Sequence, residues 1–271
     1  MKLVKFGVPV VVAVLLAAPL KAQSTDQTPT APDLGRFLPR DGSAEDESRR
    51  TLSALPKNLG RSFIGVFSKD SLAPFLIGGS AAFASTAVDK DATRFAMSQG
   101  DGLGKLGATA GGMTVMAPLT IGMFAAGQFM GPGTFRNATY DMTQAIIVST
   151  VYTGLLKTAF PRERPDGSDN KSFPSGHAAA AFAWATVAEE HWGPKVGIPS
   201  FLAATAIGLS RVQHNKHNLS DVLAGATLGY IVGRTVVREN GAPVKHKAQW
   251  SLAPATDADG AGVGAGVTVT W

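Results

Sequence analysis

Hydrophobic and polar positions divide the chain into an apolar body between two more polar ends. Six segments of the body carry few charges and many Ala, Leu, Gly, Ser and Thr residues, namely 71–88, 106–130, 139–158, 176–190, 195–211 and 219–237. Such a composition suits helices that pack closely in a membrane, although buried cores of soluble proteins use it too. A helix of roughly 18 residues is about 27 Å long, close to the ~30 Å hydrocarbon core. We therefore predict an all-α fold with a six-helix core bundle. Membrane embedding is favoured, and a soluble exported helical domain is the alternative.

The N-terminal residues have the pattern of an export signal. A short basic start, Met1–Lys5, precedes an apolar run at 7–20 that is too short to span a bilayer. We predict a signal peptide over 1–22, with Ala22 available for cleavage. An uncleaved anchor helix would also export the rest of the chain. Residues 23–57 are rich in polar residues, Pro and charges, and are expected to form a linker or loose arm.

The helical domain is expected to extend from 58 to 240, and the tail at 241–271 has a different pattern. GVTVTW at 266–271 alternates with the period of a strand, and DADG at 257–260 is a plausible turn. We expect a small C-terminal β-hairpin there. A single hairpin cannot close a membrane barrel.

The composition of the chain excludes several classes of chemistry and of binding partner. Charged residues make up 17% of the chain, below the globular average of about 25%. The chain has no cysteine, which excludes thiol catalysis, disulfides and cysteine-ligated metals. The net charge of +5 is not gathered into long Lys and Arg runs, so we predict no nucleic-acid binding.

Three clusters in the second half of the chain suggest an oxyanion site. Pro174-Ser175-Gly176-His177 precedes an Ala-rich helix, whose free N–H groups and dipole favour an anion. Gly176 allows the backbone to approach an oxyanion closely. Taken alone, this cluster is also a good helix start and nothing more.

Lys157, Arg164 and Arg211 border apolar segments and supply positive charge. Arginine can hold two phosphate oxygens with its planar fork, and lysine acts as a point charge. Each cation could instead reach an interface or pair with a carboxylate. Arg162, Glu163 and Asp166 are near enough in sequence to Arg164 to be structural partners.

His217 and Asp221 are four residues apart. They share a helix face if the last helix extends back to His217, and they meet across a helix start if Ser220 caps that helix. A carboxylate that holds one ring nitrogen leaves the other nitrogen as a nucleophile or base. The pair could equally be structural. His177 begins a different helix and is available as a proton donor.

Together the clusters resemble the three-part signature of the type 2 phosphatidic acid phosphatase superfamily: KxxxxxxRP, PSGH and SRxxxxxHxxxD. All signature positions are matched in order between residues 157 and 221. That superfamily also includes bacterial non-specific acid phosphatases and vanadium haloperoxidases. The resemblance implies that His217 attacks phosphorus, that Asp221 orients His217, and that His177 protonates the leaving group and then activates water. It also implies a set of phosphate-binding residues: Lys157, Arg164, Ser175, Gly176 and Arg211.

Two features depart from or complicate the pattern. Only eight residues, 166–173, separate the first two motifs, whereas lipid phosphatases of the family often carry a longer loop, which puts lipid selectivity in doubt. His214 lies three residues before His217, but the spacing to Arg211 and Asp221 favours His217 as the nucleophile. His191 and His246 fall outside the signature and are expected to be structural or on the surface.

The sequence therefore predicts a metal-independent, cofactor-free phosphatase that acts on phosphomonoesters or diphosphates outside the cytoplasm through a phosphohistidine. A lipid phosphate is the favoured substrate, and the inner membrane with a periplasm-facing site is the favoured location. A soluble, broad-specificity periplasmic acid phosphatase is the main alternative. A vanadium haloperoxidase and a non-catalytic phosphate-binding protein are less favoured. The sequence leaves the exact substrate and the oligomeric state open.

Overall fold

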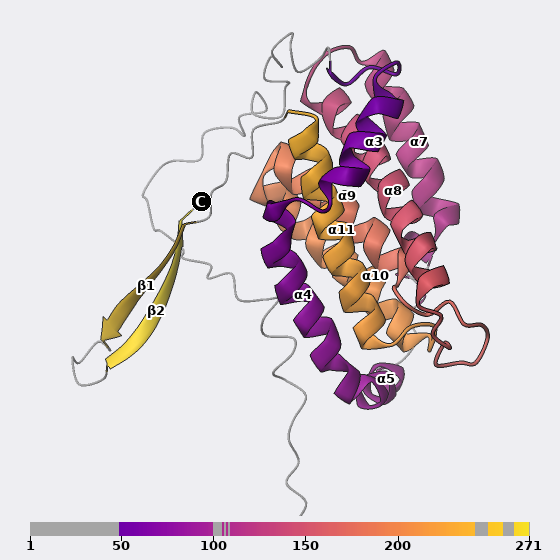
Figure 1. Ribbon diagram of the computed structural model, residues 1–271, viewed down its shortest axis with the longest axis vertical. Coiled ribbons are helices and arrows are strands. Elements are labelled where there is room, and N and C mark those ends of the chain that lie inside the picture. Colours follow the sequence, from indigo (N-terminus) through magenta and orange to yellow (C-terminus); the bar gives the residue numbers. More distant parts are fainter. Residues whose placement is uncertain are drawn as a thin grey trace, which may run out of the picture.

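Helices dominate the architecture of this chain (Figure 1). A computed structural model describes residues 49–99, 105, 107, 109–241, 249–256 and 263–270. Its α-helices are α3 (Leu55–Gly65), α4 (Leu72–Ser85), α5 (Asp89–Ser98), α7 (Met113–Phe129), α8 (Thr134–Ala159), α9 (Gly176–Trp192), α10 (Pro194–Gln213) and α11 (Leu219–Glu239). The predicted helical class is confirmed in this part of the chain. The expected signal peptide at 1–22 lies outside the described residues.

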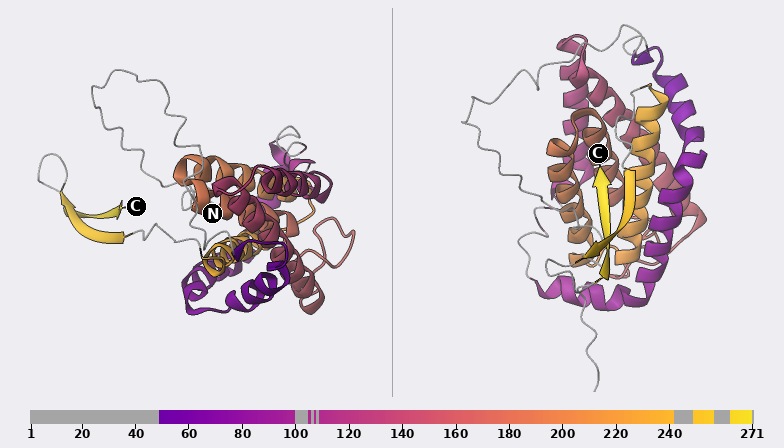
Figure 2. Two further views of the ribbon diagram at one scale, coloured as in Figure 1. Left: turned by 90° about the horizontal axis from the view of Figure 1, so that it is seen from above. Right: turned by 90° about the vertical axis from the view of Figure 1, so that its left-hand side faces the viewer.

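Helices α8, α9, α10 and α11 form the centre of the bundle. Helix α9 packs against the other three, and α4 and α7 lie outside them against α11 and α8. Figure 2 shows the same arrangement from above and from the side. Successive helices in this group alternate in direction. One end of the bundle therefore brings together the last turns of α8 and α10 with the first turns of α9 and α11.

Small residues let α9 and α11 approach closely. Helix α9 starts with an Ala-rich sequence, and three glycines of α11, at 225, 229 and 233, repeat every four residues on one face. A Cβ at Gly229 would lie 2.2 Å from the carbonyl oxygen of Ala179, and one at Gly225 would lie 2.3 Å from that of Ser175. Helix α9 ends at Gly193, whose φ of 74° lets the chain turn directly into α10.

The buried core follows from this packing. Its main cluster joins residues of α8, α9 and α11, including Met142, Val148, Tyr152, Val187, Val232 and Val236. The Tyr152 ring stacks on Phe63 of α3, with ring centroids 4.4 Å apart. The core is therefore continuous from α3 to α11.

Two helical segments were not predicted because their buried faces include polar residues, and α3 packs Leu59 and Phe63 against the core beside such residues. Helix α3 begins at Leu55, inside the segment predicted to be a linker, and it buries Asn58 and Ser62. Gln144 of α8 donates hydrogen bonds to both residues, to the carbonyl of Asn58 and the hydroxyl of Ser62. Helix α5 continues the segment predicted to end at residue 88, and it buries Asp89 and Thr93. A search for apolar periodicity does not register such faces.

The far end of the bundle holds a buried polar cluster. Asp141 is fully buried and accepts hydrogen bonds from Arg50 Nη2 at 3.0 Å and Asn240 Nδ2 at 2.6 Å. His191 Nε2 lies 2.8 Å from the same carboxylate. These contacts join the segment before α3 to α8, α9 and α11. His191 is therefore structural, as the sequence suggested.

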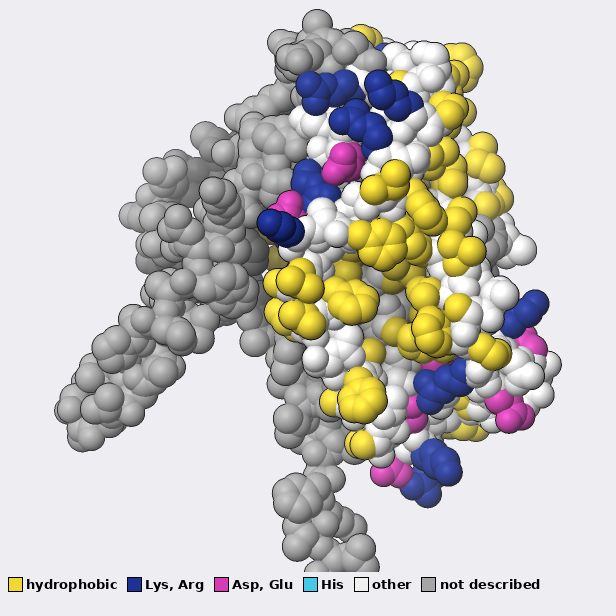
Figure 3. All heavy atoms as spheres, in the orientation of Figure 1, with side chains coloured by type: hydrophobic (Ala, Val, Ile, Leu, Met, Phe, Trp, Pro, Cys, Tyr) yellow, Lys and Arg dark blue, Asp and Glu magenta, His cyan; other side chains and the backbone are white. Residues whose placement is uncertain are grey.

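Apolar side chains cover much of the outside of the bundle. On the face in Figure 3 they gather in the middle, and charged side chains lie mainly toward the two ends. Helix α4 exposes Phe75, Ile77 and Phe83 at 62%, 72% and 80% of their surface. Among the described residues, the 30-residue run Lys69–Ser98 is long and apolar enough to cross a membrane, and only 17% of its most apolar window is buried.

Two strands follow the helices in the chain. Strand β1 (Gln249–Thr256) pairs antiparallel with β2 (Val263–Thr270), with Gln249 opposite Thr270 and Thr256 opposite Val263. The predicted turn at 257–260 lies outside the described residues.

Candidate active site

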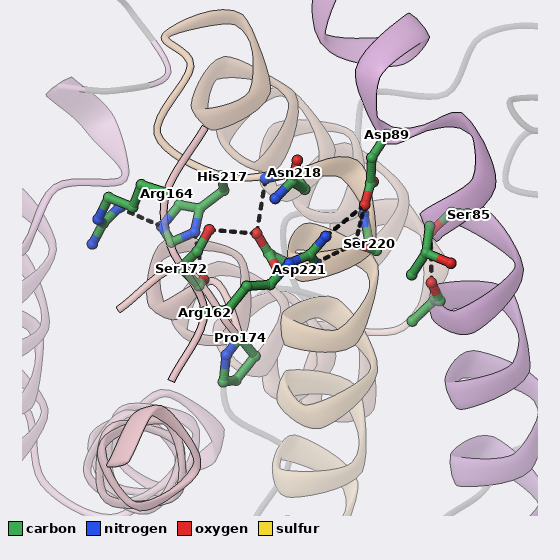
Figure 4. A network of polar contacts seen from close by, with 12 residues as sticks. Ser85, Asp89, Arg162, Arg164, Ser172, Pro174, His217, Asn218, Ser220 and Asp221 are labelled. Atoms are coloured by element: carbon green, nitrogen blue, oxygen red, sulfur yellow. Dashed lines mark hydrogen bonds and ion pairs between the residues drawn. The ribbon is translucent and has the colours of Figure 1, made fainter. Parts of the chain in front are cut away.

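The three sequence clusters meet at one end of the bundle. Lys157 lies in the last turn of α8, and Arg211 lies in the last turn of α10. His177 is in the first turn of α9, and His217 immediately precedes the N-cap of α11. The loop from 160 to 175 supplies Arg164. Figure 4 shows the polar contacts around His217 and Asp221.

His217 is held by a backbone carbonyl. Its Nδ1 lies 2.7 Å from the carbonyl oxygen of Ser172, and its Nε2 lies 3.2 Å from Nη1 of Arg164. Because a carbonyl can only accept, Nδ1 must carry the proton and Nε2 must carry the lone pair. His217 is only 2% exposed. The arrangement fixes the neutral ring in one tautomer, with the lone pair on Nε2.

The predicted contact between Asp221 and His217 is wrong. Asp221 Oδ2 accepts hydrogen bonds from Ser172 Oγ at 2.6 Å and from the backbone N–H of Asn218 at 2.8 Å. Helix α11 begins at Leu219 with Asn218 as N-cap, so His217 is outside the helix and Ser220 does not cap it. Asp221 lies at the third helical position, where its carboxylate turns back to the cap and leaves the imidazole to Ser172.

The start of α9 forms the second side of the site. Ser175 is the N-cap residue, and its side chain accepts a hydrogen bond from the N–H of Ala178 at 3.4 Å. The N–H of Ser175 donates to the carbonyl of Asp221 at 2.9 Å, which ties this helix start to that of α11. Gly176 is the first residue of α9. Free N–H groups and the positive end of the helix dipole favour an anion at this position.

The three cations of the motifs differ in their contacts. Lys157 Nζ donates to the carbonyls of Lys171 at 2.6 Å and Pro174 at 2.7 Å. Arg164 pairs with Asp169 through Nε at 2.7 Å and reaches His217 through Nη1. Arg211 Nε is buried and has no hydrogen-bond partner in the described part of the chain. An unfilled buried donor is costly, so Arg211 is poised to bind an oxyanion.

Burial and nearby positive charge lower the pKa of both His177 and His217. Burial, together with Arg164 and Lys157, lowers the pKa of His217 to about 3. Burial, together with Arg211 and Arg164, lowers the pKa of His177 to about 4. Both values lie below the ordinary histidine pKa of 6.5 because a charged imidazole is disfavoured there. Both rings are therefore neutral at neutral pH.

A cavity of about 710 Å³ opens beside the site, between the end of α8 and the following loop. It is lined by Gly154, Lys157, Thr158, Pro161, Asp169, Asn170 and Lys171. Leu155 of the same helix region is 54% exposed. Lys157 is the only residue of the three motif cations among these lining residues.

His214 is the C-cap residue of α10, and His246 lies outside the described residues. Lys216 pairs with Asp166. Among the residues that the structure describes, no group of three His, Asp or Glu side chains could hold a metal ion.

Comparison with known proteins supports the predicted resemblance. Residues 139–241, which contain all three clusters, match the model of the PAP2 superfamily. This segment is therefore similar to the PAP2 superfamily, as the three motifs predicted. A lipid A 1-phosphatase of Porphyromonas gingivalis is 44% identical over 80 residues, which cover 28% of this chain and 18% of that protein. Lipid phosphate phosphatase 1 of Arabidopsis thaliana is 27% identical over 164 residues, which cover 42% of this chain and 50% of that protein. The chain thus spans at most half of the length of either relative.

A solved PAP2 structure supports the fold. The crystal structure of a transmembrane PAP2-type phosphatidylglycerolphosphate phosphatase from Bacillus subtilis is similar over 61% of this chain and 93% of that chain. The TM-score is 0.53 and the sequence identity is 23%. The helical fold of this chain is therefore similar to the fold of that protein.

Three residues outside the PAP2 signature contribute to the site. Ser172 holds the imidazole of His217 through its carbonyl, and Arg162 and Asp89 hold Asp221 and its helix. Arg162 occupies a variable position of the first motif, where the sequence suggested a structural ion-pair partner. The carbonyl of Ser172 has no sequence signal, since every residue carries one.

Proposed function

We propose that this protein is a metal-independent phosphatase of the PAP2 superfamily that hydrolyses phosphomonoesters or diphosphates of lipids through a phosphohistidine intermediate. The observation that carries the proposal is the state of His217. The Ser172 carbonyl fixes the proton on Nδ1, so the lone pair of Nε2 faces Arg164 in the pocket. An imidazole with its lone pair aimed at a cation site suits attack on a bound phosphate.

In the first step, Nε2 of His217 attacks phosphorus, the P–N bond forms and the bond to the leaving oxygen breaks. His177 is the candidate donor of the proton that the leaving oxygen takes. His177 is neutral at neutral pH, but a bound phosphate places negative charge beside it and raises its pKa. The ring can then hold the proton that a phosphate monoanion brings.

In the second step, water attacks the phosphohistidine and neutral His177 accepts a proton from that water. The P–N bond breaks, and His217 Nε2 recovers its lone pair as inorganic phosphate leaves. The same ring thus acts as acid and then as base. The structure needs no movement of His217, because Ser172 holds Nδ1 throughout.

Stabilisation of the equatorial oxygens is assigned to the cations and the helix start. Lys157, Arg164 and Arg211 converge on the pocket, and Ser175 and Gly176 offer the N-terminal end of α9. Phosphoryl transfer depends chiefly on positioning and on neutralising these oxygens. The buried and unfilled Arg211 Nε fits this role.

A lipid substrate is supported by three observations. The similar proteins of Porphyromonas gingivalis and Arabidopsis thaliana are a lipid A 1-phosphatase and a lipid phosphate phosphatase. The bundle exposes apolar side chains, above all along the run Lys69–Ser98. The cavity that Lys157 lines is large enough for a phosphorylated headgroup to approach the site. The proposal includes export, with the site facing the periplasm, on the basis of the N-terminal sequence.

The test measures phosphate release by purified wild type, His217→Ala and His214→Ala in detergent with EDTA. The panel holds p-nitrophenyl phosphate, phosphatidic acid and a polyprenyl diphosphate. We expect activity of the wild type in EDTA, a loss of about a thousandfold or more in His217→Ala, and near wild-type rates in His214→Ala. His214 is a matched control, because it is the same residue type three positions earlier.

Other results would change the assignment. An inactive wild type, or a His217→Ala variant with an unchanged rate, would overturn the phosphohistidine mechanism. Activity that EDTA abolishes would overturn metal independence. A clear preference for p-nitrophenyl phosphate over both lipids would replace the lipid phosphatase by a broad-specificity acid phosphatase.

A further inference from the structure

We propose that Arg162, held in place by Asp89, is a positioning residue that sets the orientation of the His217 nucleophile. This inference rests on the proposed function, since it assigns a role toward the same nucleophile. Arg162 occupies a variable position of the first motif, Asp89 lies outside the motifs, and neither residue hydrogen-bonds to His217 in the described part of the chain. Both act through a continuous chain of hydrogen bonds that Figure 4 displays.

The chain begins at the guanidinium of Arg162. Its Nη1 donates to Asp221 Oδ1 and to Ser220 Oγ, both at 2.7 Å. Its Nη2 donates to Asp89 Oδ2 at 2.9 Å. One planar group thus links the first residue of α5 to the first turn of α11, and its fork fixes the distance between the two carboxylates.

The next link leads from Asp221 to the nucleophile. Asp221 Oδ2 accepts from Ser172 Oγ, and the Ser172 carbonyl accepts from Nδ1 of His217. The N–H of Ser172 also donates to the carbonyl of Arg162 at 2.9 Å. Arg162 therefore contacts Ser172 by two routes, through its own backbone and through Asp221. The carbonyl that orients His217 can shift only if these bonds break.

Asp89 completes the arrangement from a helix outside the central group. It is buried, and besides Arg162 it accepts from the N–H of Ser220 at 2.9 Å and the hydroxyl of Ser220 at 2.6 Å. Arg162 and Ser220 thus make four hydrogen bonds to the carboxylates of Asp89 and Asp221. The guanidinium lies between two negative charges, and Asp221 is completely buried. Without Arg162, only neutral donors would hold the carboxylate of Asp221, at a desolvation cost.

The contacts of Arg162 suit a role in positioning His217 and not in binding the substrate. Substrate contacts are assigned to Lys157, Arg164 and Arg211, and the guanidinium of Arg162 is occupied by Asp89, Ser220 and Asp221. Loss of Arg162 should therefore leave phosphate affinity in place and misalign the attacking nitrogen. A small misalignment of a reacting group can cost about a hundredfold in rate.

The test compares Arg162→Gln, Arg162→Lys and Asp89→Asn with two control variants, Asp91→Asn and Arg94→Gln. The controls remove the same charges from the exposed ion pair of α5, where Asp91 and Arg94 are 59% and 79% exposed. kcat and KM are measured with p-nitrophenyl phosphate, and the inhibition constant of inorganic phosphate reports the pocket. Thermal unfolding in detergent monitors the fold.

We expect kcat to fall about 10- to 100-fold in Arg162→Gln and less in Asp89→Asn. KM and the inhibition constant of phosphate should change by no more than about threefold, and Arg162→Lys should recover part of kcat because it keeps one ion pair. The controls should match the wild type.

Unchanged kcat in folded Arg162→Gln would overturn the proposal. So would a loss of phosphate affinity in step with kcat, or an Arg162→Lys variant no better than Arg162→Gln. Failure of the proposed function itself looks different, because wild type would then be inactive or His217→Ala active.

Discussion

At the residue scale, the two histidines of the pocket are tuned by their surroundings and not by a carboxylate partner. Burial, Arg164 and Lys157 hold the pKa of His217 at about 3, and the Ser172 carbonyl opposes them only in part. The nucleophile is therefore unprotonated over the whole physiological range. An ordinary histidine would be largely protonated below pH 6.

The low pKa of His217 predicts how kcat/KM changes at acidic pH. kcat/KM reports groups of the free enzyme, and His217 must be neutral to attack, so activity should persist down to about pH 5. Arg164→Gln removes the largest electrostatic cause of the low pKa of His217, so its acidic limb should move toward the ordinary value of 6.5. The measurement is kcat/KM from pH 3 to 9 for both proteins.

Ionisation of the substrate affects both pH profiles equally, because both proteins are assayed with the same substrate. A difference between the profiles therefore reports a group of the enzyme. The profile of Arg164→Gln would contradict the assignment if its acidic limb stayed in place or moved to lower pH. Phosphate affinity should also fall in this variant, since Arg164 is assigned to the equatorial oxygens.

Sequence reasoning at this scale identified residue types well and contacts less well. It placed His177, His217, Lys157 and Arg211 at a common site, because motif spacing constrains side chains that one chemistry requires. It assigned Asp221 to the imidazole, whereas Asp221 binds Ser172 and Asn218. A backbone carbonyl competes for Nδ1 here, and the path of a loop cannot be read from residue identity.

At the element scale, the close packing of α9 and α11 positions both helix starts of the site. Gly225 of α11 lies against the carbonyl of Ser175, which is also the N-cap of α9. The glycine face therefore sets the spacing between the PSGH segment and the segment that bears Asp221. Packing and catalysis share the same two helices.

A methyl group on this face should separate the helices. Gly229→Ala would place a Cβ 2.2 Å from the carbonyl oxygen of Ala179, so we expect a destabilisation of about 1–3 kcal/mol or more. Gly122→Ala is the matched control, because nothing lies within 4 Å of a Cβ there. The control should be neutral, or stabilise α7 by up to about 1 kcal/mol.

Denaturant unfolding in detergent, followed by circular dichroism, checks both variants. Equal stability of Gly229→Ala and wild type would show that the two helices can move apart without cost.

The six predicted segments correspond to α4, α7, α8, α9, α10 and α11, because long apolar stretches are visible in a sequence. Helices α3 and α5 were not recognised, because their buried faces carry Asn58, Ser62, Asp89 and Thr93.

At the scale of the whole molecule, two buried polar clusters lie at opposite ends of an apolar bundle. One cluster contains Asp89, Arg162 and Asp221 and adjoins the site. The other contains Arg50, Asp141, His191 and Asn240 and closes the far end. The far cluster holds the segment before α3 against three central helices.

Asp141→Ala should destabilise the fold by about 3–5 kcal/mol, because it removes the carboxylate that Arg50, His191 and Asn240 share. Asp70→Ala is the control, since Asp70 is 75% exposed where it pairs with Arg238 and should cost less than about 1 kcal/mol. Unfolding midpoints in detergent give both values. A similar small loss in the two variants would show that the far cluster contributes little.

The location of the site at one end of the bundle has a consequence for lipid traffic. In a bundle that crosses a bilayer, the end that holds Lys157 and His217 lies on the side of a single leaflet. Under the proposed function, a phosphorylated lipid made in the opposite leaflet would have to be flipped across the membrane before this chain could act on it. The rate of the proposed reaction would then depend on how fast the lipid is flipped into the leaflet that the site faces.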